Sequence, residues 1–253
     1  MRWRAECRYF FVALGYFTRV PIPRRIIGHT AGDLDQATRY FPLIGACVGA
    51  LAAAVYLLAA RLWPPGVAVL LSMAVSLVVT GTFHEDGLAD SCDGFGGGYT
   101  REDVLRIMRD SRIGSFGAVA LVLALALKWQ ALASLPPLRA AWILLAAHAA
   151  SRVAAVSLLM TLDYAREEGK ARPVAQRMSA RAFAFAALCG LPWLFWPDWR
   201  AGLVALAALL VVRTLVARYL RHRLGGYTGD CLGFAQQISE LTIYLTVLGW
   251  TSS

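Results

Sequence analysis

The chain has 253 residues and a formal net charge of +9, yet it is 58% hydrophobic and only 16% charged. About a quarter of the residues in soluble domains are charged, so this composition disfavours a soluble enzyme and favours a membrane protein. The positive charge does not indicate nucleic-acid binding, because no basic stripe with interleaved aromatic residues stands out. The five cysteines are widely spaced without a Cys-x-x-Cys pair, which predicts neither a disulfide framework nor a zinc site.

The apolar residues come in blocks, which predict an all-α, polytopic integral membrane protein with one domain over residues 1–253. An N-terminal helix over about 6–20 follows Arg2, Arg4 and Arg8 and lacks a small-residue cleavage site. We expect it to lie in the membrane interface. About seven transmembrane helices are expected at about 41–62, 66–83, 115–135, 138–161, 182–197, 200–219 and 232–250.

Lysine and arginine are distributed unevenly between the two sides of this expected topology. With the N-terminus inside, the inner segments hold 19 basic residues and the outer turns hold four, namely Arg61, Lys128, Arg139 and Arg200. This is the positive-inside pattern of membrane proteins. It places the loops with polar and charged residues together on the cytoplasmic face, an arrangement that suits a cytoplasm-facing enzyme better than a transporter.

The second expected span leads into a stretch with four carboxylates within nine positions, Glu85, Asp86, Asp90 and Asp93. If that span continues as a helix, Asp86, Asp90 and Asp93 share one face. Three carboxylates on one face suit Mg²⁺ or Mn²⁺, and the alternative is a solvated acidic helix end. Glu85 lies off that face and would support the metal ligands without contacting the ion itself.

Residues beside these carboxylates are further candidates. His84 could equally be a residue of the site or a structural histidine at the membrane interface with its hydrogen bonds made. Gly94 leaves room for a ligand near the backbone. Residues 84–113 are expected to form a long loop, in which a helix begins at the capping sequence Thr100-x-x-Asp103. An arginine next to serine and glycine suits phosphate recognition, which makes candidates of Asp110, Ser111 and Arg112.

A second group of candidates lies near the C-terminus, where Asp230, Gly233, Gln237 and Glu240 share one helical face. Glu240 would lie inside a membrane span, where a carboxylate usually marks function. The alternative is a buried interhelical hydrogen bond through Gln237 and Glu240. His148 and Arg152 lie inside another span and would pair with Glu240 or bind substrate.

Three sequences together resemble one family. They are His84-x-Asp-Gly-Leu-Ala-Asp-x-x-Asp-Gly, Asp110-Ser-Arg-Ile-Gly-x-Phe-Gly117 and Gly229-Asp-x-x-Gly-x-x-Gln-Gln-x-x-Glu240. They are similar to cobalamin synthase, or adenosylcobinamide-GDP ribazoletransferase, of the late vitamin B12 pathway. The likeness covers nearly the whole chain, while Glu85 departs from the leucine often found there in the family. That departure weakens Glu85 as a metal ligand.

The resemblance implies a Mg²⁺-dependent phosphotransferase of the bacterial cytoplasmic membrane. Its substrates would be adenosylcobinamide-GDP and α-ribazole or α-ribazole 5′-phosphate, and GMP would be released. Asp86, Asp90 and Asp93 would bind Mg²⁺ and diphosphate, with Glu85 as a further metal candidate. One of Asp90, Asp93 and Asp230 would take the hydroxyl proton. The substrate would be bound by His84, Gly94, Asp110, Ser111, Arg112, Arg166, Lys170, Gln237 and Glu240.

The partners expected are the lipid bilayer and these substrates, together with other membrane-associated enzymes of B12 assembly or a second copy of the chain. The rival enzymes are a lipid head-group phosphotransferase of the CDP-alcohol type and an aspartate-rich prenyltransferase. The alternative function that is not enzymatic is a cation transporter, which would have polar groups at membrane depth on several helices.

Overall fold

The computed structural model describes residues 2–27, 31–166 and 177–252. In these ranges the regular structure is helical, apart from a parallel bridge between Tyr164 and Tyr227. In chain order, the helices are α1 (Arg2–Phe17), α2 (Arg24–Ile27), α3 (Ala31–Ala37), η1 (Thr38–Tyr40), α4 (Phe41–Ala59), α5 (Pro65–Thr80), α6 (Phe83–Gly97), α7 (Arg101–Ile107), α8 (Ser115–Ala133), α9 (Pro137–Ser157), η2 (Leu158–Met160), α10 (Ala180–Gly190), η4 (Pro192–Phe195), α11 (Trp199–Leu224) and α12 (Gly229–Ser252). The predicted all-α class is therefore confirmed.

Four helical stretches among the described residues are long and apolar enough to cross a membrane, Asp33–Ala59, Ser115–Ala133, Pro137–Met160 and Trp199–Leu224. The pair α5 and α6 adds a fifth if it forms one broken span. The expected count of seven is not confirmed by length and composition. The α10 helix has only 11 residues, and the 24 residues of α12 include polar side chains that lower its hydropathy, Gln236, Gln237 and Glu240.

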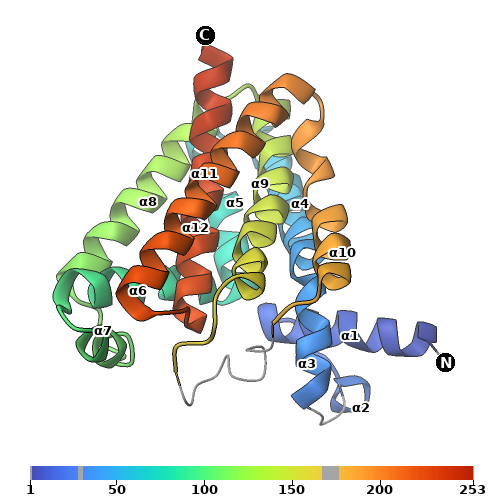
Figure 1. The fold of residues 1–253 in the computed structure, drawn as a ribbon. Helices are drawn as coiled ribbons and strands as arrows, with labels where there is room; N and C mark the ends of the chain where they lie inside the picture. The colour runs from blue at the N-terminus through green and yellow to red at the C-terminus, as the bar shows by residue number, and fades with distance from the viewer. Residues whose placement is uncertain (1, 28–30, 167–176, 253) are drawn as a thin grey trace.

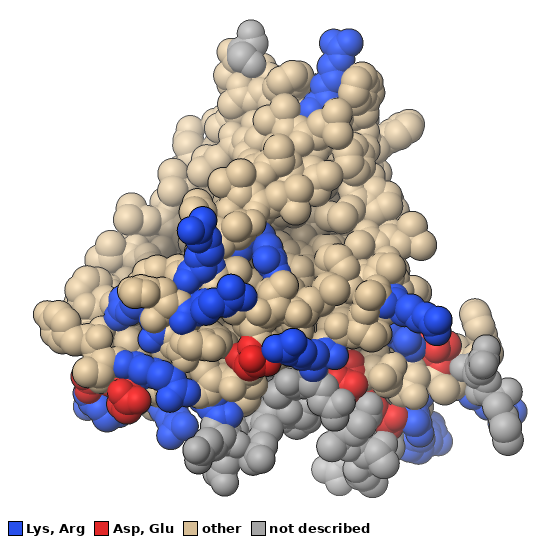
Figure 2. All heavy atoms as spheres, in the orientation of Figure 1, with Lys and Arg blue, Asp and Glu red and all other residues tan. Residues whose placement is uncertain are grey.

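The long helices run side by side between two ends of the molecule, with the N-terminus at one end and the C-terminus at the other (Figure 1). The short helices α2, α3 and α7 lie at the N-terminal end, and α1 runs across the bundle there. Figure 2 shows that the acidic side chains of the viewed face and most of its basic side chains gather at this same end, a few basic side chains reach its middle, and the part above the middle is apolar apart from one basic group near the top. We call this end the charged end. The distribution matches a bundle whose apolar part lies in the membrane.

The chain turns sharply between α5 and α6, which are inclined by 87° to each other. Gly81 and Thr82 both have left-handed backbone conformations, with φ of 64° and 57°. Glycine adopts this conformation without steric cost, but threonine does so rarely. The expectation of a loop from residue 84 is therefore wrong for residues 84–97, because α6 forms a separate helix. The predicted helix start at Thr100 is confirmed, since its hydroxyl accepts a hydrogen bond from the Asp103 amide at 3.1 Å.

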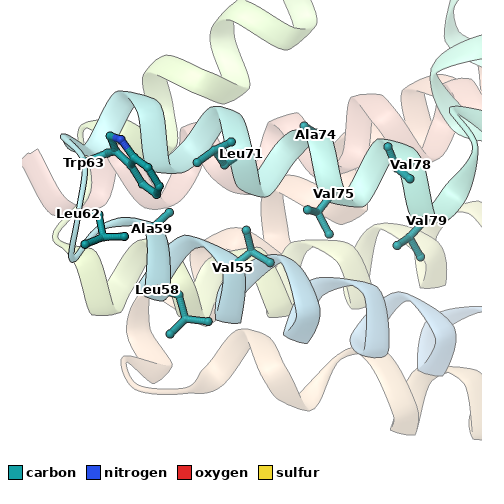
Figure 3. A pocket seen from close by; sticks show the side chains of 10 residues that line it. All are labelled: Val55, Leu58, Ala59, Leu62, Trp63, Leu71, Ala74, Val75, Val78 and Val79. Carbon is teal, nitrogen blue, oxygen red and sulfur yellow. The ribbon is translucent and has the colours of Figure 1, made fainter.

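A groove lies between α4 and α5 and has a volume of about 480 Å³ (Figure 3). Its lining is aliphatic except for the indole of Trp63 near the α4–α5 turn. None of the lining residues is ionisable, so the groove offers no group for acid–base or metal chemistry. Its surface suits hydrocarbon, and the candidate site lies elsewhere.

Candidate functional site

Helices α6 and α12 cross in close contact at Gly87 and Gly233. A Cβ atom on Gly87 would lie 2.8 Å from the carbonyl oxygen of Asp230 and 3.1 Å from the Cα atom of Gly233. Only glycine lets the two backbones approach this closely. The crossing therefore brings the acidic stretch beside the first turn of α12, which is far away in the sequence.

Three carboxylates gather at this crossing, those of Asp86, Asp90 and Asp230. Asp86 is exposed and the other two are half-buried. Asp90 is close enough to Asp86 and Asp230 to interact with both electrostatically. Neither Asp86 nor Asp90 accepts a side-chain hydrogen bond from the described residues. Their oxygens are thus available to a cation or to a substrate.

Asp230 is held by Arg166, whose guanidinium donates a hydrogen bond to its Oδ2 atom at 2.7 Å. The exposed fraction of the Arg166 side chain is only 10%. Burial raises the pKa of the Asp230 carboxyl, and the positive charge of Arg166 opposes that rise. The structure thus places one basic group among the three carboxylates. The other basic candidate from this loop, Lys170, lies outside the described residues.

Asp93 has a different environment from Asp86 and Asp90. Its two carboxylate oxygens accept hydrogen bonds from the backbone amides of Gly114 at 2.7 Å and Gly117 at 2.8 Å. These amides belong to the N-terminus of α8, where N–H groups have no partner within the helix and a negative charge is stabilising. Asp93 therefore fixes the start of α8 against α6.

The loop from Asp110 to Gly114 is consequently anchored next to α6. Within it, the Arg112 guanidinium donates to both oxygens of Asp110, at 2.7 Å to Oδ2 and 3.0 Å to Oδ1. Arg112 lowers the pKa of the Asp110 carboxyl to about 2, so this exposed pair stays ionised at neutral pH. Ser111 between them is also exposed. Gly94, by contrast, is buried under α7, because a Cβ there would lie 2.7 Å from Met108 Cγ.

His84 is buried at the start of α6, and its ring stacks on Phe41 with a centroid distance of 5.5 Å. Its Nε2 atom has no hydrogen-bond partner among the described residues. The next residue, Glu85, accepts a hydrogen bond from the Gln237 amide at 2.8 Å. Glu85 therefore points away from Asp86 and into the bundle.

Glu240 lies in a buried polar network inside the bundle, apart from the carboxylates at the crossing. Lys128 donates to Glu240 at 2.8 Å and to Gln237 at 2.7 Å. The Gln236 amide donates to the second Glu240 oxygen at 2.6 Å, and the His148 Nδ1 atom lies 3.6 Å from that oxygen. The alternative of an interhelical hydrogen bond through Gln237 and Glu240 thus matches the contacts. Arg152 contacts His148, donating to its carbonyl oxygen at 2.6 Å.

Lys128 was expected in an outer turn, and that assignment is wrong. It lies in α8, 4% exposed, and pairs with Glu240 from α12. A lysine inside an apolar run is itself a signal of function or of a buried partner. Because Lys128 lies near the end of the expected span 115–135, the sequence alone fits an outer position equally well.

The described residues include no group of three histidine, cysteine, aspartate or glutamate side chains close enough to bind one metal ion. The chemistry of Asp86 and Asp90 nevertheless fits Mg²⁺. This ion is often bound through one or two carboxylates, with the remaining ligands supplied by water and substrate phosphates. A site of that kind needs free carboxylate oxygens beside a phosphate-binding surface, and Asp86 and Asp90 offer such oxygens.

Comparisons with known proteins identify one family. The family model described as cobalamin-5-phosphate synthase matches residues 9–248. A relative from Ralstonia nicotianae is 55% identical, with 99% of this chain and 98% of the relative covered. Relatives from Ralstonia pickettii (53% identical, 99% and 98% covered) and Shewanella frigidimarina (44% identical, 98% and 97% covered) are similar over comparable lengths. All three are named adenosylcobinamide-GDP ribazoletransferase. No solved structure matches the chain.

Proposed function

The chain belongs to the cobalamin-5-phosphate synthase family, and we propose that it catalyses the reaction for which its relatives are named. A hydroxyl of α-ribazole, or of its 5′-phosphate, attacks the phosphorus attached to cobinamide in adenosylcobinamide-GDP. A new O–P bond forms, the P–O bond of the diphosphate breaks, and GMP leaves. The hydroxyl proton passes to a base, and the product is adenosylcobalamin or its 5′-phosphate.

The observation that supports a reaction centre at the crossing is a pair of carboxylates, Asp86 and Asp90, that accept no hydrogen bond from the part of the chain that the structure describes. We assign them to binding Mg²⁺. When bound, the ion would neutralise charge on the diphosphate, which is the main requirement of phosphoryl transfer. Glu85 has the weaker claim as a ligand, because its Oε1 atom already accepts from Gln237.

Asp230 and Arg166 form the opposite side of the proposed centre. The Arg166 guanidinium carries a full charge on a side chain that is 10% exposed, so it suits a phosphate oxygen of the substrate. Asp230, held in place by Arg166, is positioned to accept the proton of the attacking hydroxyl. Asp90, beside Asp230, is the other candidate base. Asp93 acts by positioning the loop that carries Arg112.

We also propose that the charged end faces the cytoplasm of a bacterium. The inner segments of the expected topology hold 19 basic residues. Because Lys128 is buried in the bundle, the outer turns hold only Arg61, Arg139 and Arg200. This strengthens the positive-inside asymmetry. The carboxylates at the crossing would then meet cytoplasmic substrates.

The rival functions explain less. The cation transporter predicts polar groups at membrane depth, and the Lys128–Glu240 network provides such groups on several helices. These groups, however, bind one another, and a family of transferases matches nearly the whole chain. The CDP-alcohol and prenyltransferase alternatives lack that support.

The test is an assay of membranes that contain the protein with adenosylcobinamide-GDP, α-ribazole and Mg²⁺. The expected result is equal release of GMP and formation of a cobalamin. Membranes with the Asp90→Asn variant, inserted at the same level, should form neither product. If the inserted wild-type protein releases no GMP and forms no cobalamin, the proposed function is wrong.

A further inference from the structure

A second groove lies between α9, α10 and α11 and has a volume of about 310 Å³. Most of its lining is apolar, and Leu210, one of the lining residues, is 58% exposed. The groove therefore opens to the outside of the bundle along two helices that are apolar enough to cross a membrane. Its polar lining residues include Arg213 from α11 and Thr161 near the end of α9.

Two guanidinium groups converge on Thr161, which lines this polar part of the groove. Arg213 donates to the Thr161 hydroxyl at 2.7 Å, and Arg221 donates to the Thr161 carbonyl oxygen at 3.0 Å. Arg213 also donates from Nε to the Ser157 hydroxyl at 2.7 Å. Neither arginine forms an ion pair with a carboxylate of the described residues. Figure 2 shows basic side chains reaching from the charged end over the apolar face.

Two positive charges that share one neighbour repel each other, and their cost rises in an apolar environment. A bound anion would remove this repulsion. The groove beside the arginines adds a second requirement, because its apolar lining is best covered by hydrocarbon. A ligand with both properties is an anionic phospholipid, and basic pockets between transmembrane helices on the cytoplasmic side commonly bind such lipids.

We propose that this groove binds one anionic phospholipid, with its phosphate at Arg213 and Arg221 and an acyl chain along α9 and α11. The lipid would connect α11 to α9 and α10 at the charged end. This site is separate from the carboxylates at the α6–α12 crossing and does not depend on the reaction assigned to them.

The test uses the full-length protein, purified in detergent and depleted of lipid, and native mass spectrometry with phosphatidylglycerol or phosphatidylcholine of identical acyl chains. Wild-type protein should bind phosphatidylglycerol more tightly. Arg221→Gln keeps the bonds from Arg213 to α9, so it should fold, and it should bind phosphatidylglycerol about fivefold more weakly, since one basic residue contributes about 1 kcal/mol. Arg218→Gln, an exposed arginine elsewhere on α11, is the matched control and should bind like wild type.

Three results would overturn the proposal. The first is equal affinity of wild-type protein for the two lipids. The second is unchanged phosphatidylglycerol binding by Arg221→Gln, or a loss of equal size in Arg218→Gln. The third is displacement of phosphatidylglycerol by inorganic phosphate at equal concentration, which would show that the arginines bind a free anion and that the groove contributes nothing.

Discussion

Lys128 and Glu240, 112 residues apart in the chain, form an ion pair of 2.8 Å inside the helical bundle. Both side chains are about 5% exposed or less. The pair joins α8 to α12, and Gln237 connects it to Glu85 on α6. The helix that carries Asp86 and Asp90 is therefore linked, through one buried network, to two neighbouring helices.

Replacing Lys128 by methionine should destabilise the protein by about 3 kcal/mol, because it leaves the buried charge of Glu240 without its partner. Unfolding of the detergent-solubilised protein measures the loss. The double variant Lys128→Met/Glu240→Gln removes both charges and should regain most of the stability. Equal stability of Lys128→Met and wild type would contradict a buried pair.

Gly87→Ala should reduce turnover about 100-fold in protein that still inserts, since the new Cβ would push α6 away from Asp230. A displacement of about 1 Å at a reaction centre has an effect of this size. Gly97→Ala is the control on the same helix, because its nearest neighbour is the flexible end of Ile107 at 3.3 Å. If both variants keep full activity, the close crossing is irrelevant to catalysis.

Asp93→Asn should lower the free energy of unfolding by about 1–2 kcal/mol, because asparagine offers one acceptor oxygen to the two amides at the start of α8. Asp90→Asn, whose carboxylate accepts no hydrogen bond from the described residues, should lose activity but not stability. The measurement is unfolding of both variants alongside the transfer assay. An Asp93→Asn protein of normal stability that needs more Mg²⁺ would instead make Asp93 a metal ligand.

Removing divalent ions with a chelator should abolish the transfer reaction, and added Mg²⁺ should restore it. In Asp86→Asn, the Mg²⁺ concentration for half-maximal rate should rise about tenfold or more, by analogy with the loss of other groups around metal sites. Glu102→Gln, an exposed acidic residue on α7, serves as a control. A rate that does not respond to the chelator would show that the carboxylates act without a metal ion.

The proposed orientation predicts that the C-terminus, which lies opposite the charged end, faces the periplasm (Figure 1). Alkaline phosphatase fused after Ser253 should therefore be active in cells, and green fluorescent protein at the same position should be dark. A fluorescent fusion with an inactive phosphatase would reverse the orientation of the bundle.

The helical class and most helix positions could be predicted from apolar blocks, because those blocks are local in the sequence. The helix start at Thr100 was equally local, since a hydroxyl three residues before an acidic residue satisfies a free amide. The bend at Gly81 and Thr82 was not predicted, because threonine rarely adopts positive φ and only the surrounding contacts enforce it.

The candidate site could be predicted only as far as local helical spacing reaches. Helical spacing grouped Asp86, Asp90 and Asp93, but spacing alone could not show that Asp93 faces the amides of α8. Spacing also grouped Asp230 with Glu240, although the two lie in different environments, one beside Arg166 and the other beside Lys128. Such differences arise from tertiary contacts, which a single sequence does not contain.

The contact between α6 and α12 has a consequence for how the protein is made. Glu85 and Gln237 are 152 residues apart, a stretch that a ribosome translates in about 8–30 s. During that interval α6 has already been synthesised, but its partner helix does not yet exist. A truncated chain that ends before α12 lacks Asp230, so incomplete products of translation would carry the acidic helix without an assembled reaction centre.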